Sequence, residues 1–219
     1  LVRFREALRQ TSVGRLLAVR WMGQLTDGIF QSSLASFLLF SPERQPDAQS
    51  AAVAFAVVLL PYSLVGPFVG TILDRVSRQR VILFSNLFGA FTLIFIAGLI
   101  RNGATGVELT IFVLVAFGVN RLILAGLSAG LPLLLDTTGT QGRNILVSIN
   151  ATAVTGGTVF VVLGGGIGIG IRGLLEGSVD ASQADGILVT MSAACFFIAG
   201  LLALRIKKDQ LGPLPHERS

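Results

Sequence analysis

Long apolar runs dominate the sequence, and they limit the chain to structures that can exist inside a lipid bilayer. The runs are roughly 18 to 27 residues long, the length at which an α-helix crosses the hydrocarbon core. Strands of a membrane barrel would instead alternate apolar and polar residues in segments of about ten. Charged residues make up only 13% of the chain, whereas a soluble domain carries about a quarter. Because backbone amides must be paired within lipid, the pattern predicts an all-α integral membrane protein.

Six transmembrane helices are predicted, at 16–40, 51–73, 81–100, 109–135, 145–171 and 187–204. The connections between them differ in charge. One side carries most of the basic residues: Arg3, Arg5, Arg9, Arg15, Arg75, Arg78, Arg80, Arg143, Arg205, Lys207, Lys208 and Arg218. The other side carries three arginines against six acidic residues. By the positive-inside rule the basic side is cytoplasmic, so we expect a multi-pass plasma-membrane protein with both termini in the cytoplasm.

Charged residues within the predicted spans occur only in the first span, at Arg20 and Asp27, and in the fourth, at Arg121. Asp27 and Arg121 both fall near the middle of the bilayer by residue count. Leaving either one in lipid would cost at least about 3 kcal/mol, so each is expected to face the bundle interior and to find a partner. Two interpretations remain open, a structural pair that ties the bundle together and a functional pair in which Asp27 carries a proton.

Further polar residues surround this pair in the sequence. Gln24 and Gln31 share one helix face with Arg20 and Asp27, because the four positions are spaced by four, three and four residues. Asn120 directly precedes the arginine of span four. The pattern predicts a hydrated cavity for substrate and protons lined by Asp27, Arg121, Gln24, Gln31 and Asn120. Arg20 lies closer to the inner end of its span, where its side chain can simply extend to the lipid headgroups.

The segment 70–82 joins predicted spans two and three and carries a distinctive arrangement of glycine, acid and bases. Its residues of interest are Gly70, Asp74, Arg75, Arg78 and Arg80. A glycine permits close helix approach, and the aspartate can bridge to an arginine or a helix N-terminus of a neighbouring helix. This arrangement, here called the gate motif, suits a cytoplasmic latch that breaks and re-forms. The alternative is an ordinary basic loop on the cytoplasmic side.

The gate motif resembles the signature of the major facilitator superfamily, a glycine followed by Asp-Arg and a basic pair between spans two and three. The chain departs from that pattern at Ser77, where the family prefers glycine, and at Gln79, where it prefers a base. The segment from Asn120 to Gly130 is similar to the family's span-four pattern of a buried arginine followed by glycines. Span five is rich in glycine but lacks the proline of the motif that the family's exporters often carry.

The resemblance implies a fold of two six-helix halves, each made of inverted three-helix repeats. Residues 1–205 would form the N-terminal half, and 206–219, with Gly212, Pro213 and Pro215, would be a cytoplasmic linker to a second bundle. The expected function is secondary active transport of a small solute by alternating access, coupled to protons and directed to efflux of drugs or metabolites. The expected partners are the lipid bilayer, a small-molecule substrate and the second bundle.

The sequence also bears on functions other than transport. A membrane-embedded enzyme is not expected, because the one histidine, His216, lies in the tail and Cys195 has no basic neighbour in its span. No metal-binding constellation, cofactor site or ATP-binding loop is recognisable in the sequence. Nucleic-acid binding would need a basic face on a soluble element. A non-transporting membrane scaffold, such as a degenerate half transporter, remains the alternative to transport.

Overall fold

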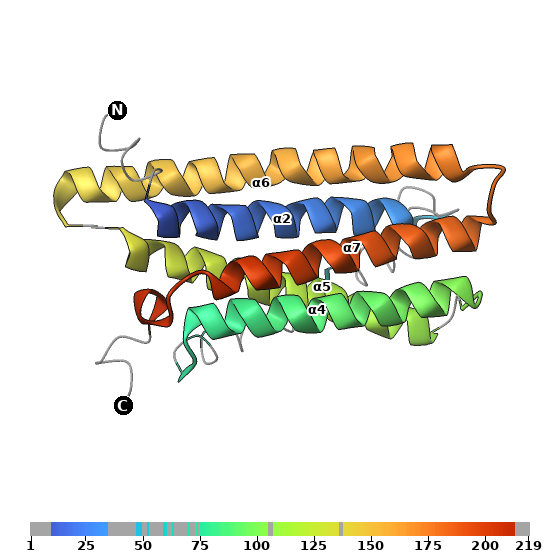
Figure 1. Ribbon diagram of the computed structural model, residues 1–219, viewed down its shortest axis with the longest axis horizontal. Coiled ribbons are helices and arrows are strands. Elements are labelled where there is room, and N and C mark those ends of the chain that lie inside the picture. The colour runs from blue at the N-terminus through green and yellow to red at the C-terminus, as the bar shows by residue number, and fades with distance from the viewer. Residues whose placement is uncertain are drawn as a thin grey trace.

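The computed structural model of the protein describes residues 10–34, 47–49, 75–104, 107–135 and 138–212, with six single positions between 52 and 73. Within these residues the chain forms long α-helices that lie side by side in an elongated bundle (Figure 1). They are α2 (Thr11–Leu34), α4 (Arg78–Arg101), α5 (Val107–Gly130), α6 (Gly139–Leu175) and α7 (Ala181–Leu204), with short 3₁₀ helices η3 (Leu131–Leu134) and η4 (Lys208–Leu211). The prediction of a helical membrane protein is therefore confirmed.

Four of these helices, α4 to α7, are long and apolar enough to cross a membrane. α2 has the same 24-residue length as α4 and α7 but is less apolar, because it carries the polar stripe of the first predicted span. These five helices correspond to predicted spans one, three, four, five and six. The second predicted span, 51–73, lies mostly outside the described residues, so the six-helix count remains a prediction.

Local sequence explains two of the helix boundaries. α5 ends at Gly130 and tightens into η3, where Pro132 lacks the amide hydrogen that an α-helix would need. α6 begins at Gly139, before the apolar run, and its 37 residues give a length of about 55 Å. A hydrocarbon core is only about 30 Å thick, so α6 extends beyond it into the polar region.

Contacts near the chain ends fix the helix directions. Ser12 at the start of α2 donates a hydrogen bond to Gln210 of η4, with 2.7 Å between Oγ and Oε1. Gln79 at the start of α4 donates to the carbonyl of Ala203 at the end of α7, over 3.2 Å. α2 and α4 therefore begin at the end of the bundle where α7 finishes (Figure 1). α2 packs along α6 and α7, and α4 packs along α5 and α7.

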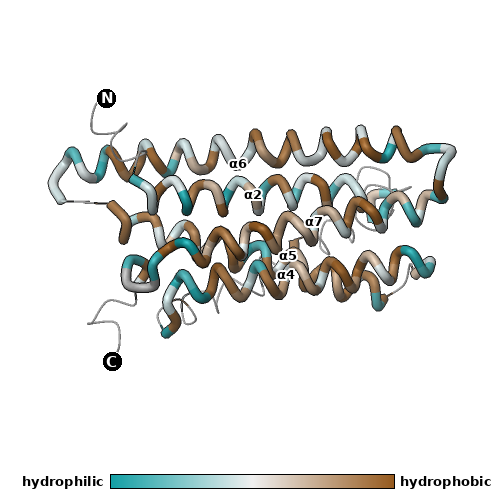
Figure 2. The backbone as a smooth tube through the Cα atoms, viewed as in Figure 1, coloured by the Kyte–Doolittle hydropathy of each residue, from teal (hydrophilic) through white to brown (hydrophobic). Residues whose placement is uncertain are grey.

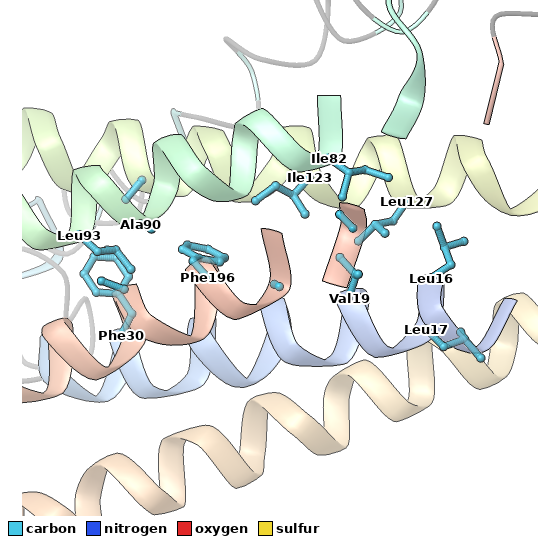
Figure 3. Packing of buried hydrophobic residues seen from close by; sticks show 14 of the residues in the cluster. Leu16, Leu17, Val19, Phe30, Ile82, Ala90, Leu93, Ile123, Leu127 and Phe196 are labelled. Atoms are coloured by element: carbon cyan, nitrogen blue, oxygen red, sulfur yellow. The ribbon is translucent and has the colours of Figure 1, made fainter. Parts of the chain in front are cut away.

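Apolar side chains from α2, α4, α5 and α7 meet in one core (Figure 3). Phe196 of α7 lies against Gly89 of α4, where an added Cβ would be 3.1 Å from the phenyl ring. The outward faces are apolar too, and brown covers much of the helices in Figure 2. Large exposed side chains include Phe84, Phe88, Phe91, Ile94 and Phe95 of α4. A surface of this kind faces the lipid bilayer rather than water.

The glycine-rich α6 packs against α2 at very short range. Cβ atoms added to Gly164 or Gly168 would overlap the carbonyl of Leu25 and the hydroxyl of Ser32, respectively. Trp21 of α2 stacks on Phe160 of α6, with ring centroids 5.6 Å apart, and its indole nitrogen donates to the carbonyl of Ala153. Small residues thus allow the two backbones to touch, as the glycine-rich run predicts.

Candidate substrate and coupling site

Asp27 lies in the middle of α2 and is buried, with 8% of its surface exposed. Gln31, one turn further along α2, donates a hydrogen bond from Nε2 to Asp27 Oδ2 over 2.9 Å. From α5, the charge of Arg121 and the side chain of Asn120 also act on the Asp27 carboxylate. The helices therefore bring four of the five predicted cavity residues together: Asp27, Gln31, Asn120 and Arg121.

Such a cluster can hold a charge within the membrane. Asn120 is buried at 3% exposure, and its Oδ1 has no hydrogen-bond partner among the residues that the structure describes. Asp27 receives compensation from a cation on a different helix, so a change in the separation of α2 and α5 would alter its environment. The arrangement is suited to a carboxylate that gains and loses a proton or a cationic group as the helices move.

Gln24, the fifth predicted residue, is in contact with α6. A Cβ added to Gly157 of α6 would be 3.3 Å from Gln24 Cγ. The amide nitrogen Nε2 of Gln24 is buried and has no hydrogen-bond partner within the described part of the chain. A buried donor left without a partner is costly, so its presence marks a place where a further polar group can bind.

Arg20, expected near the inner end of its span, has a partner that the sequence did not identify. Its Nη1 donates a hydrogen bond to Ser128 Oγ of α5 over 3.2 Å. The guanidinium is therefore held by a neighbouring helix rather than only extending towards headgroups. Seven residues separate Arg20 from Asp27 on α2, and seven separate Ser128 from Arg121 on the antiparallel α5. A search for matched polar positions on the two helices could have found this second pair.

The gate motif is only partly described. Arg78 begins α4 and is buried at 7% exposure, whereas Arg75 and Arg80 are exposed. Asp74 lies outside the described residues, so the predicted latch is not tested. Gly70 is exposed, and an added Cβ would meet no atom within 4 Å. Most residues around Gly70 lie outside the described part of the chain, so the expectation that Gly70 allows close helix approach stays a prediction.

The opposite end of the bundle carries an ion pair that joins α6 to α7. Arg172 Nη1 donates to Oδ1 of Asp185, whose side chain is 3% exposed. Nearby, Arg101 of α4 donates to Thr190 of α7 over 3.3 Å. These contacts connect three helices at this end of the bundle. Among the residues that the structure describes, no three metal-ligating side chains come together.

Comparison with known proteins identifies the family. An uncharacterized MFS-type transporter of Mycobacterium tuberculosis is 37% identical to this chain over 205 residues, which cover 94% of the chain. The chain belongs to the major facilitator superfamily. A protein of the same description from Mycobacterium bovis matches equally. The lysophospholipid transporter LplT of Photorhabdus laumondii, a further similar protein, is 38% identical over 95 residues, or 39% of the chain.

The two mycobacterial matches cover most of this chain but less than half of each relative. The chain spans 44% of the length of the two mycobacterial relatives that it matches. No family model matches the chain. No solved structure matches it either. The sequence-based assignment to the major facilitator superfamily is thus confirmed by its relatives.

Proposed function

We propose that the complete protein is a secondary active transporter that moves a small solute across the plasma membrane by alternating access. The described helices would belong to its N-terminal six-helix half, with both ends of that half in the cytoplasm. Its relatives are named transporters, and its membrane-length helices require a lipid bilayer. The parallel directions of α2 and α4 agree with one further span between them. A second six-helix bundle would complete the pathway, since the chain spans 44% of its relatives.

One observation carries the proposed coupling mechanism: a buried carboxylate, Asp27, faces Arg121 and Asn120 of another helix. In one state the positive charge of Arg121 compensates the carboxylate. When α2 and α5 change their separation, the carboxylate loses this compensation and takes up a proton or a cationic substrate group. A protonation cycle linked to helix movement is what proton-coupled exchange requires. Antiport of protons against a drug or metabolite, with net efflux, follows as the working model.

Two substrate classes are compatible with this site. A single acid in an apolar bundle favours basic, lipophilic compounds. The name of the similar Photorhabdus laumondii protein adds lysophospholipids. Both classes are amphiphilic, so both would enter a site with polar groups on α2 and α5 and apolar helices around them.

The test uses the native polypeptide, purified at its full length from its own membrane and reconstituted in proteoliposomes. Transport of ethidium and of a labelled lysophospholipid is measured with and without an imposed pH gradient. Asp27→Asn is expected to abolish the response to the gradient. Asp180→Asn is the matched control, because Asp180 is exposed at the start of α7. Unchanged gradient-driven transport in Asp27→Asn would refute the coupling role.

The same preparation tests the need for a second bundle. A native polypeptide with a mass near twice 23.1 kDa would supply both halves of the transporter in one chain. A stable species near 23.1 kDa would require dimerisation for transport. If that species is also monomeric and inactive with both probes, the scaffold interpretation replaces transport.

A further inference from the structure

Arg20 differs from the other membrane-embedded charges in its partners. Asp27 and Arg121 act on each other across α2 and α5. Arg20 instead donates to the neutral hydroxyl of Ser128, and the described residues provide it with no carboxylate. The α2–α5 interface therefore holds two positive charges and one negative charge. The unbalanced positive charge lies at Arg20.

Unused hydrogen-bond donors surround this charge. Arg20 Nε is buried without a partner, and so is Nε2 of Gln24, as far as the structure describes the chain. The two residues are four positions apart on α2, so their side chains share one helix face. Both unused atoms are donors, and a donor pair beside an uncompensated cation is suited to an acceptor that carries negative charge.

The position of Arg20 also bears on what can bind it. Arg20 is nine residues after the start of α2 at Thr11, about 14 Å along the helix. Arg15, closer to that start, already contacts the carbonyl of Arg205 at the end of α7. Arg20 therefore lies deeper than the residues that close the cytoplasmic end, on the helix face that carries Asp27.

We propose that Arg20, Gln24 and Ser128 form a binding position for an anionic group of the transported substrate, a phosphate or a carboxylate. The guanidinium supplies charge and a planar pair of donors, which match the oxygens of such a group. Gln24 adds a neutral donor, and Ser128 orients the guanidinium from α5. This inference rests on the proposed transport function and narrows its substrate to molecules with an anionic group. Asp27, seven residues further along α2, keeps its separate coupling role.

The experiment measures equilibrium binding to the native full-length protein in nanodiscs of phosphatidylcholine. The probes are lysophosphatidylglycerol, a monoacylglycerol of the same chain length and inorganic phosphate. The variants are Arg20→Gln, Arg20→Lys and Gln24→Leu. Arg143→Gln is the matched control, because Arg143 is an exposed residue of α6 away from the site. A second set of nanodiscs contains phosphatidylglycerol, which tests whether an ordinary bilayer headgroup fills the position.

Lysophosphatidylglycerol is expected to bind at least about tenfold more tightly than the monoacylglycerol, and Arg20→Gln should remove that difference. Arg20→Lys should retain part of it, since it keeps the charge but loses the planar donor pair. Gln24→Leu should weaken binding of lysophosphatidylglycerol and leave binding of the monoacylglycerol unchanged. A different outcome is that inorganic phosphate binds as tightly as the lysolipid and loses its binding equally in Arg20→Gln. That result would support the site and identify a free anion as its occupant.

Three results would overturn the proposal. Equal affinity for lysophosphatidylglycerol and the monoacylglycerol would show that the protein has no site for the anionic group. An equal loss in Arg143→Gln would mean that only general surface charge acts. Complete loss of probe binding in the nanodiscs that contain phosphatidylglycerol would leave Arg20 as a contact to bilayer headgroups. If any of these occurs while Asp27→Asn still abolishes gradient-driven transport, the inference fails and the proposed function stands.

Discussion

Gly28 of α2 and Gly165 of α6 lie in backbone contact, so that a Cβ added to Gly28 would be 2.8 Å from the amide nitrogen of Gly165. The same Cβ would overlap the carbonyl of Val161. Backbone atoms cannot turn aside as a flexible side chain can. Any side chain at position 28 must therefore push the two helices apart, and this affects the helix that carries Asp27.

Gly28→Ala is expected to lower the free energy of unfolding by about 1–3 kcal/mol, because overpacking a tight interface forces backbone shifts. Gly166→Ala is the control, since an added Cβ there meets no atom within 4 Å. That control should be neutral or slightly stabilising, because alanine favours helix. Thermal unfolding in detergent measures both variants. Equal midpoints for the two would show that α2 and α6 do not pack as described.

The ion pair between Arg172 and Asp185 gives a second stability prediction. The side chain of Asp185 is 3% exposed and that of Arg172 is 31% exposed, so removal of the arginine takes the positive charge away from a buried carboxylate. Arg172→Met should be destabilising by up to about 3 kcal/mol. Arg172→Met combined with Asp185→Leu should recover much of that loss, because apolar residues that replace both charges are often tolerated. Unfolding midpoints provide the measurement, with Glu176→Gln at an exposed position as control.

A double variant that is less stable than Arg172→Met alone would contradict this account. It would mean that Asp185 stabilises the bundle through its other contacts rather than through the arginine. The single and double variants therefore distinguish a pair that fastens α6 to α7 from two independent polar contacts.

Most of the helical architecture could be predicted from the sequence, because apolar length alone identifies membrane helices. The limits of the helices could not be predicted as well. The apolar run predicts a span at 145–171, whereas α6 extends from Gly139 to Leu175. Hydropathy reports the hydrocarbon core, while backbone hydrogen bonding continues through polar residues outside it. The proposed linker from residue 206 likewise contains η4, whose Leu211 is fully buried.

The shared helix face of the candidate site residues on α2 could be predicted from the sequence, but their partners on other helices could not. Spacing placed Arg20, Gln24, Asp27 and Gln31 on one face of α2. Which of these side chains contacts α5 depends on how far α2 and α5 are shifted along each other. The sequence of a single helix does not contain that shift. The contact of Arg20 with Ser128 follows from that shift. The contact of Gln24 with Gly157 of α6 likewise depends on helix packing that the α2 sequence does not contain.

Leu211 of η4 leads to a prediction about the end of the bundle where α2 begins. A Cβ added to Gly130 would be 3.1 Å from Leu211 Cδ2, and Leu211 itself is fully buried. Leu211→Ala should release η4 by removing about 2 kcal/mol or more of burial energy. Trypsin, which cleaves after Lys207, should then cut about tenfold faster. Leu204→Ala is the control because Leu204 is 54% exposed. An unchanged cleavage rate would mean that η4 is held by other contacts, such as Ser12 with Gln210.

The pair of Asp27 and Arg121 allows the structural and functional interpretations to be separated. Asp27→Asn leaves Arg121 without its charge partner, so the single variant should be less stable than the native protein. Asp27→Asn combined with Arg121→Gln removes both charges and should regain at least about half of the lost stability. If the pair only ties α2 to α5, transport driven by a pH gradient should return with stability. If Asp27 carries the proton, the neutral pair should fold normally and remain uncoupled. Unfolding midpoints and proteoliposome transport, measured on the same preparations, decide between the two, and recovered coupling in the double variant would remove Asp27 from the mechanism.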